Sequence, residues 1–196
     1  LSSLLSRTGP GHSRPCEIIL SAIEHATVYE SALALKEAGI KPRFIGMKKD
    51  GTINLNHLAE TLSPHTQLIS VMLVNNETGV IQPIVEAANL TNRYAHKIGR
   101  KIPFHTDAVQ ALGKIPLCLK ALPFDSAAFS SHKIGGPRGV GLLYKRQGTP
   151  LEAFIKGGGQ EYGWRPGTEN LAGIAAFVFA LEQALTHLDE IGRAHV

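Results

Sequence analysis

The stretch Leu68-Ile69-Ser70-Val71-Met72-Leu73-Val74 decides the fold of this chain of 196 residues. It is apolar throughout except for Ser70, so it does not alternate between apolar and polar residues. A short, continuously apolar run is typical of a strand that is buried on both faces of a parallel sheet. The stretch therefore predicts a sheet that is covered by helices on both sides.

Strands and helices are expected to alternate on either side of this stretch. Further strands are predicted at residues 17–22, 43–47, 102–105, 126–129 and 139–144. Segments with helical signals lie between several of them, and residues 49–51 have the composition of a turn. This alternation predicts an α/β domain.

The helices are predicted from the residues at their ends. Thr27 to Glu30 offers a capping box for a helix that Gly39 can close. Asn54 can cap a short helix that continues through residue 62. Residues 83–98 are expected to be helical, with proline in the first turn and glycine directly beyond the end. The apolar run 171–181 is too short to cross a bilayer, and we expect it to form a buried helix.

Four polar residues follow predicted strands directly. They are His25, Asn76, Asp107 and Lys133. Open α/β sheets bind their ligands at the carboxyl ends of their strands. The sequence therefore predicts that these four side chains gather at one edge of the sheet.

Two stretches together look like a site for pyridoxal phosphate. They are Ser130-Ser131-His132-Lys133-Ile134-Gly135-Gly136-Pro137 and His105-Thr106-Asp107-Ala108-Val109-Gln110. A lysine amine can hold the aldehyde of this cofactor covalently, and a carboxylate can keep its ring nitrogen protonated. Lys133 and Asp107 are the candidates for these two roles.

Further stretches extend this likeness over nearly the whole chain from residue 17 onward. Glu24-His25, residues 74–79, residues 157–161 and residues 165–170 occur in the same order and at similar spacing. The series resembles the class V, fold-type I enzymes, and within them the cysteine desulfurases and selenocysteine lyases. The resemblance implies an aspartate-aminotransferase-like large domain, with a mostly parallel central sheet and flanking helices.

The resemblance also implies roles at the cofactor ring. Asp107 would pair with the pyridine nitrogen, while Gln110 and Asn76 would contact the phenolic oxygen. His25 would stack over the ring and could also move protons. Each residue has an ordinary alternative, since Asp107 can cap a turn and His25 can be a satisfied polar residue. Asn75 is expected to be the purely structural member of its pair.

The phosphate of the cofactor would be held by three side chains. In the family pattern Ser130 and His132 donate to it, and Thr168 reaches the phosphate of the neighbouring subunit in a homodimer. Turn capping is the alternative for the first two. The glycines at 139–141 and 157–159 lack the spacing of a nucleotide-binding phosphate loop and are expected to form backbone turns near the site.

Composition excludes several classes of function. The net charge of +4 is mild, and Lys and Arg are scattered, so neither nucleic-acid binding nor a membrane association is predicted. The two cysteines, Cys16 and Cys118, form neither a disulfide framework nor a spaced metal site, and no metal is expected. Residues 1–15 make a poor secretory signal, so a cytoplasmic location is the simpler reading.

The chain is expected to be a fragment of a longer protein. Residues 1–16 would be a remnant of an upstream segment, and residues 17–196 a large domain that binds pyridoxal phosphate, without the carboxyl-terminal small domain. In the family pattern, the nucleophilic cysteine and the arginine that binds the substrate carboxylate lie beyond Val196. Neither Cys16 nor Cys118 is assigned the nucleophilic role.

The resemblance implies a pyridoxal-phosphate-dependent cysteine desulfurase. Such an enzyme removes sulfur from L-cysteine, leaves L-alanine and an enzyme persulfide, and passes the sulfur to an acceptor protein for iron-sulfur cluster assembly or thiolation. One alternative is a selenocysteine lyase, acting on L-selenocysteine, or another class V aminotransferase. A second alternative is a non-catalytic fragment that dimerises or binds a partner.

Overall fold

Six strands form a single sheet in the structure of the chain, a computed structural model that describes residues 16–188. The strands are β1 (Cys16–Ser21), β2 (Ile40–Ile45), β3 (Thr66–Ser70), β4 (Phe104–Asp107), β5 (Ser126–Ser130) and β6 (Gly141–Lys145). Their order is β2-β1-β3-β4-β5-β6. All neighbours are parallel except β5 and β6, which are antiparallel. The prediction of a mostly parallel α/β sheet is confirmed.

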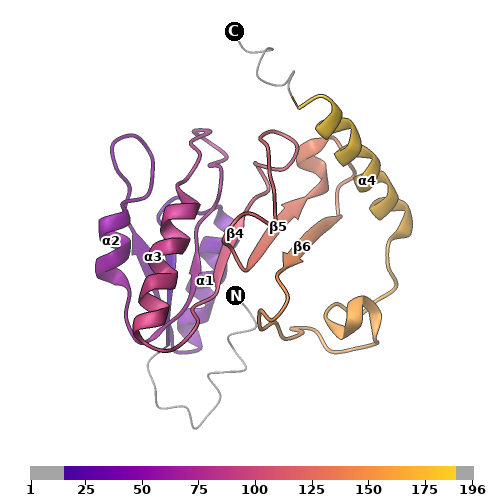
Figure 1. The fold of residues 1–196 in the computed structure, drawn as a ribbon. Coiled ribbons are helices and arrows are strands. Elements are labelled where there is room, and N and C mark those ends of the chain that lie inside the picture. The colour runs from indigo at the N-terminus through magenta and orange to yellow at the C-terminus, as the bar shows by residue number, and fades with distance from the viewer. Residues whose placement is uncertain (1–15, 189–196) are drawn as a thin grey trace.

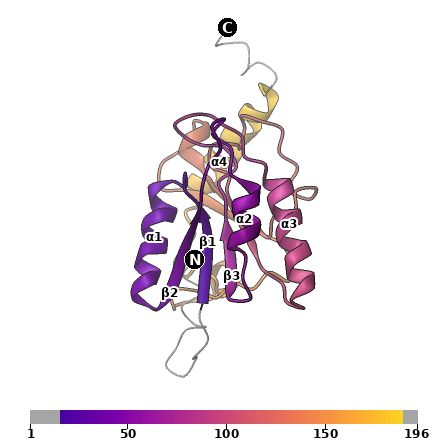
Figure 2. The ribbon, with the colours of Figure 1, turned by 90° about the vertical axis from the view of Figure 1, so that its left-hand side faces the viewer.

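The central strands of the sheet are buried on both faces, as the apolar stretch predicted, although β3 ends at Ser70 and the edge strand β6 is largely exposed. Helix α1 (Ala26–Glu37) lies on one face, and α2 (Leu55–Thr61) and α3 (Ile84–Lys97) lie on the other (Figures 1 and 2). Successive side chains of β1 point to opposite faces of the sheet, because side chains alternate along a strand. Ile18 and Leu20 pack with α1, whereas Ile19 packs in the larger cluster that contains residues of α2 and α3.

Two helices begin where the sequence predicted them. The Asn54 side chain accepts hydrogen bonds from the backbone N–H groups of Asn56 and His57 at 3.0 and 3.2 Å, and so caps α2. Helix α3 follows Pro83 and ends before Gly99, whose φ of +63° suits glycine.

The predicted capping box of α1 is wrong. The helix begins at Ala26, and the residue that caps it is His25, whose Nδ1 accepts a hydrogen bond from the Thr27 backbone N–H at 3.2 Å. Thr27 therefore lies inside the first turn. The prediction that Gly39 closes this helix is consistent with its position directly after the last turn, at a φ of +80°.

The prediction that residues 171–181 form a buried helix is only half right. Helix α4 (Leu171–Thr186) is present, but just a narrow stripe of it is buried, including Phe177 and Ala180. Leu171 and Phe179 are 74% and 64% exposed, because α4 lies at the margin of the fold and packs along one side only, against residues 131–134 and the core (Figure 1). No helix within residues 16–188 is both long and apolar enough to cross a membrane.

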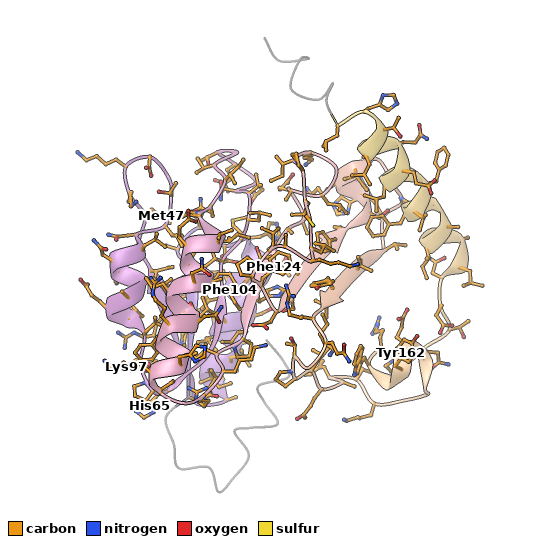
Figure 3. The ribbon with its side chains drawn as sticks, in the orientation of Figure 1. Met47, His65, Lys97, Phe104, Phe124 and Tyr162 are labelled. Atoms are coloured by element: carbon orange, nitrogen blue, oxygen red, sulfur yellow. The ribbon has the colours of Figure 1, made fainter. Side chains whose placement is uncertain are left out.

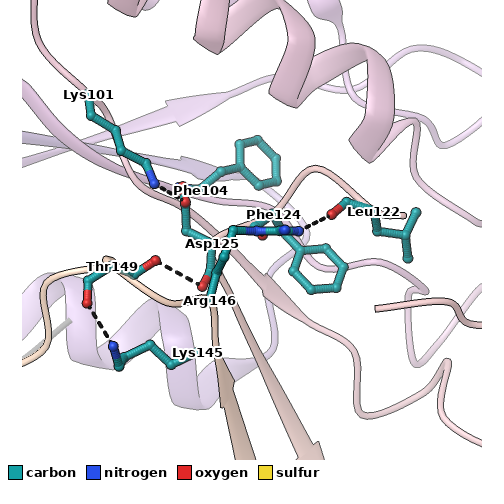
Figure 4. A network of polar contacts seen from close by, with 8 residues as sticks. All are labelled: Lys101, Phe104, Leu122, Phe124, Asp125, Lys145, Arg146 and Thr149. Carbon is teal, nitrogen blue, oxygen red and sulfur yellow. Dashed lines mark hydrogen bonds and ion pairs between the residues drawn. The ribbon is translucent and has the colours of Figure 1, made fainter. Parts of the chain in front are cut away.

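A polar network joins the amino ends of β4 and β5 to the end of β6 (Figure 4). The Asp125 carboxylate accepts a hydrogen bond from the Phe104 backbone N–H at 2.9 Å and forms an ion pair with Lys101. Arg146 donates to the backbone oxygens of Leu122 and Phe124. The aromatic rings of Phe104 and Phe124, labelled in Figure 3, are buried beside it. This network holds the end of the sheet that lies away from the polar residues singled out above.

We expect His105 to make the stability of the protein depend on pH. Its Nδ1 lies 2.9 Å from Ser126 Oγ on the next strand, and burial lowers the pKa of His105 from 6.5 to about 4. Between these values the unfolded chain takes up a proton that the folded chain does not, so the free energy of unfolding falls as the pH decreases.

The variant His105→Asn lacks this titration and serves as the reference. From about pH 7.5 to about pH 4.5, the stability of the wild type relative to the variant should fall by about 2 to 3 kcal/mol, as measured by urea denaturation. A constant difference across this range would show that the histidine titrates alike in the folded and unfolded states.

Candidate active site

The predicted site residues follow the carboxyl ends of the parallel strands. The chain leaves β1 toward β2 on one side and leaves β3 toward β4 on the other, so the strand order reverses between β1 and β3. Ligands of open α/β sheets bind at such a reversal, where the helices that follow the two strands part to opposite faces. His25 follows β1 at this point, and Asp107 ends β4 next to β3.

Lys133 lies in a short 3-10 helix, η2 (Ser131–Ile134), which begins as β5 ends. The Lys133 side chain is exposed, whereas Ser131 is fully buried and anchors the turn. Gly135 ends the turn with a φ of +85°, a conformation that favours glycine. A Cβ atom at Gly136 would lie 2.1 Å from Ser131 Oγ, so glycine is required there. The sequence around the lysine thus folds into a tight turn that presents the amine to solvent.

Ser130 and His132 lie on either side of this anchor and contact each other. Ser130 Oγ is 2.9 Å from His132 Nδ1, and the imidazole is exposed. Hydroxyl and imidazole side chains are both of a kind that can donate to a phosphate. The structure therefore puts these two predicted phosphate ligands together and next to Lys133.

Asp107 is the last residue of β4 and is partly buried. Its backbone oxygen accepts from the Leu73 N–H at 2.8 Å, and its Oδ1 accepts from the Val109 N–H at 2.9 Å. The carboxylate thus caps a turn, which was the alternative role expected for Asp107. Among the described residues no side chain donates to it, so it keeps acceptor capacity for a protonated ring nitrogen.

Gln110 contacts a lysine that the sequence analysis did not single out. Gln110 Oε1 accepts a hydrogen bond from Lys114 Nζ in the turns that follow β4. Burial and the nearby charge of Lys133 lower the pKa of Lys114. These contacts bring Gln110 and Lys114, which follow β4, near Lys133, which lies in η2.

His25 and Asn76 are both exposed at this edge. His25 caps α1, and its Nδ1 also lies 2.9 Å from Thr27 Oγ1. The stacking of His25 on a cofactor ring stays a prediction. Asn76 lies in the turn after Val74, with its side chain in solvent, and its contact with the cofactor likewise stays a prediction.

Asn75 has the structural role that we expected. Its Oδ1 accepts from the backbone N–H groups of Glu77 and Thr78 and from Thr78 Oγ1, at 2.9–3.1 Å. Its Nδ2 donates to the backbone oxygen of Ile23 at 3.2 Å. Asn75 thus shapes the turn that carries Asn76 and ties it to the segment that carries His25.

Thr168 does not join the other predicted phosphate ligands. It is exposed in the loop before α4, whereas η2 packs against the later turns of that helix near Ala180 and Ala184 (Figure 1). Within one chain, Thr168 therefore lies at the far end of α4 from Ser130 and His132. A contact with the phosphate of a neighbouring subunit stays a prediction.

Glu24 is the residue of this edge whose role the sequence analysis missed. It is buried, and its carboxylate accepts from the Met72 backbone N–H at 2.7 Å and from Ser21 Oγ at 2.5 Å. Burial, with a smaller contribution from the charge of Asp107, raises the pKa of Glu24 to about 7. The position of Glu24 directly before His25 was the available signal in the sequence. The role of Glu24 could not be predicted from it, because its partner Met72 is distant in the sequence.

The side chains at this edge fit pyridoxal phosphate in their chemistry. The exposed amine suits the aldehyde, and the carboxylate without a side-chain donor suits the ring nitrogen. The amide suits the phenolic oxygen, and the hydroxyl–imidazole pair suits the phosphate. All of them come from the exits of neighbouring strands. Such a set can form a covalent bond to a carbonyl and move protons.

Comparison with known proteins identifies similar chains. The family model described as aminotransferase class-V matches residues 6–196. A cysteine desulfurase of Klebsiella pneumoniae is 42% identical over 180 residues, covering 92% of this chain and 43% of that protein. A cysteine desulfurase IscS of Dictyoglomus turgidum is 40% identical over 173 residues, covering 88% of this chain and 42% of that protein.

Solved structures show the same architecture. A NifS-like protein superposes with a TM-score of 0.86 at 37% identity, over 96% of this chain and 51% of its own. DndA from Streptomyces lividans superposes with a TM-score of 0.81 at 36% identity, over 96% of this chain and 52% of its own. The prediction of an aspartate-aminotransferase-like large domain is confirmed at the level of fold.

We expect Asn75 and Asn76 to differ in their effects on stability. Asn75→Ala removes an acceptor of three hydrogen bonds and should lower the free energy of unfolding by about 2 to 3 kcal/mol. Asn76→Ala changes an exposed side chain and should alter it by less than about 0.5 kcal/mol. Urea denaturation measures both, and equal losses would contradict the structural role of Asn75.

Proposed function

Because this chain belongs to the class-V aminotransferase family, whose cysteine desulfurases depend on pyridoxal phosphate, we propose that it is the cofactor-binding part of a cysteine desulfurase. The reaction is removal of sulfur from L-cysteine, with L-alanine and an enzyme persulfide as products. The chain spans about two fifths of the length of the curated relatives it matches. We assign residues 17–196 to the large domain.

The observation that carries this proposal is the arrangement of Lys133 and Asp107. Asp107 ends β4 and Lys133 follows β5, a neighbouring parallel strand, at the edge where such sheets bind ligands. Lys133 is exposed on a rigid turn, and Asp107 keeps acceptor capacity. An amine and a carboxylate in this relation are what a pyridoxal phosphate site requires.

Lys133 is proposed to act twice. Its Nζ would hold the cofactor between turnovers and, once displaced by the substrate amine, would take the proton from the substrate α-carbon. When bound, pyridoxal phosphate supplies a ring that withdraws electrons from the substrate. Asp107 would keep the proton on the ring nitrogen, because its negative charge favours the protonated form.

The other polar residues would orient the ring. Gln110 and Asn76 would donate to the phenolic oxygen, and His25 would pack over the ring face and move protons near it. Ser130 and His132 would donate to the phosphate. We propose that Thr168 completes this phosphate site in a neighbouring subunit, so that the active form is a homodimer.

Sulfur transfer needs groups that we assign to no residue of this chain. A nucleophilic cysteine would attack the substrate sulfur, and an arginine would hold the substrate carboxylate. Neither Cys16, which begins β1, nor Cys118, which is exposed, is placed in that role. A sulfur-acceptor protein serving iron-sulfur cluster assembly is the proposed partner, and the cytoplasm is the proposed location.

Replacement of Lys133 tests the cofactor site. With added pyridoxal phosphate, the wild type should show a visible absorbance band that Lys133→Ala lacks, because the covalent bond to the amine is gone. Lys120→Ala, which changes an exposed lysine at the other end of the sheet, should keep the band. A band of equal strength in Lys133→Ala would contradict the assignment.

The reaction itself is tested with L-cysteine and a thiol reductant. Sulfide and alanine should form in equal amounts and only when Lys133 is present, in a form of the protein that also carries the sulfur-accepting cysteine. 3-Mercaptopyruvate formed by transamination, in place of alanine and sulfide, would contradict the desulfurase proposal while leaving the cofactor site in place.

Replacement of Asp107 tests the contact with the ring nitrogen. Asp107→Asn keeps the shape but loses the charge, and a hydrogen bond to a charged group contributes about 1.5 to 3 kcal/mol. The dissociation constant for pyridoxal phosphate should therefore rise by about 10- to 100-fold, as measured by absorbance titration. Asp50→Asn, in an exposed turn, is the control, and equal affinities in both variants would rule out the contact.

A further inference from the structure

Glu24 links the segments that follow β1 and β3, where the strand order reverses. It follows β1, and its Oε1 accepts hydrogen bonds from Ser21 Oγ at 2.5 Å and from the Met72 backbone N–H at 2.7 Å. Its Oε2 accepts from Ser70 Oγ, at the end of β3, at 3.3 Å. One buried carboxyl group therefore links the exit of β1 to the exit of β3.

This link connects two residues of the proposed site. On one side, Glu24 directly precedes His25. On the other side, Met72 directly precedes Leu73, whose backbone N–H donates to the Asp107 backbone oxygen at 2.8 Å. Short stretches of backbone therefore connect the Glu24 carboxyl group to both His25 and Asp107.

Within residues 16–188, the charged group that acts on Glu24 is Asp107. The contacts from β1 and β3 are neutral, since they come from the hydroxyl groups of Ser21 and Ser70 and from a backbone N–H. Burial raises the pKa of Glu24 to about 7, and the charge of Asp107 acts in the same direction. Near neutral pH, the charge of Glu24 is therefore adjustable and lies within electrostatic reach of Asp107.

We propose that Glu24 is a positioning residue of this site: its carboxyl group fixes His25 relative to Asp107, and its proton tunes the field at the ring nitrogen that Asp107 holds. The proposal rests on the proposed function, because it concerns the same cofactor site. Glu24 touches neither substrate nor cofactor and acts through its two neighbours.

Glu17 provides a matched control at the opposite end of β1. It is a glutamate that is buried to a similar degree, but it lies at the amino end of β1. Its carboxylate accepts from Ser63 Oγ at 2.7 Å and pairs with Arg43 at 3.5 Å. Loss of Glu17 therefore tests the cost of removing a buried carboxylate away from the site.

The first measurement needs no cofactor. In the full chain, Glu24→Leu should speed hydrogen exchange of the Met72 amide by at least about tenfold, because that N–H loses its acceptor. Glu17→Leu should not do so beyond its effect on global stability. In Glu24→Gln, which is always neutral, the folding equilibrium constant relative to wild type should rise by about 10- to 100-fold from about pH 5 to about pH 8.

The second measurement is the affinity for pyridoxal phosphate at matched protein stability. Glu24→Leu should bind at least about tenfold more weakly than wild type, whereas Glu24→Gln, which retains an acceptor for Met72, should stay within about threefold. Glu17→Leu should also stay within about threefold. The pH profile of the visible band should have an inflection near neutral pH in wild type that Glu24→Gln lacks.

Three results would overturn the proposal. They are an unchanged exchange rate at Met72 in Glu24→Leu, equal losses of affinity in the two leucine variants, and an unchanged pH profile in Glu24→Gln. If wild type itself forms no band that depends on Lys133, the proposed function fails and the role of Glu24 toward the cofactor fails with it. A normal band with equal leucine variants overturns the positioning role alone.

Discussion

The reversal of strand order between β1 and β3 is the constraint on which the rest of the structure depends. Because β1 leads to one side of the sheet and β3 to the other, α1 and α3 cover opposite faces. The carboxyl ends of the two strands are therefore left between the helices that cover the two faces. Polar groups gather there because both neighbouring faces are already filled with apolar side chains.

The two ends of the sheet differ in what their polar groups do. At the amino end, Asp125 and Arg146 are joined to the backbone of neighbouring segments, so their hydrogen-bonding capacity is used within the fold. At the carboxyl end, Asn75 and Glu24 hold the backbone while Lys133 stays exposed. The division leaves reactive groups available on a scaffold that is already fixed, which is how a preorganised site is built.

Predictions from the sequence succeeded where a signal and its partner are close in the chain. The cap at Asn54 and the end of α3 at Gly99 depend on contacts within a single turn. The prediction of a capping box at Thr27 failed because the imidazole of His25, two residues earlier, accepts the hydrogen bond of the Thr27 backbone N–H. The expected burial of residues 171–181 failed because composition shows that a helix is apolar, but not which of its faces meets the core.

The sequence by itself determined the alternation of strands and helices, the position of Lys133 after a strand and the set of groups that can serve a cofactor. Only the tertiary structure decided which of these side chains lie close together. Glu24 and Met72 are 48 residues apart in the chain, and Lys114 lies near Lys133 although the two follow different strands. Such contacts depend on the order of strands in the sheet, which is fixed by hydrogen bonds and packing between distant segments rather than by local preference.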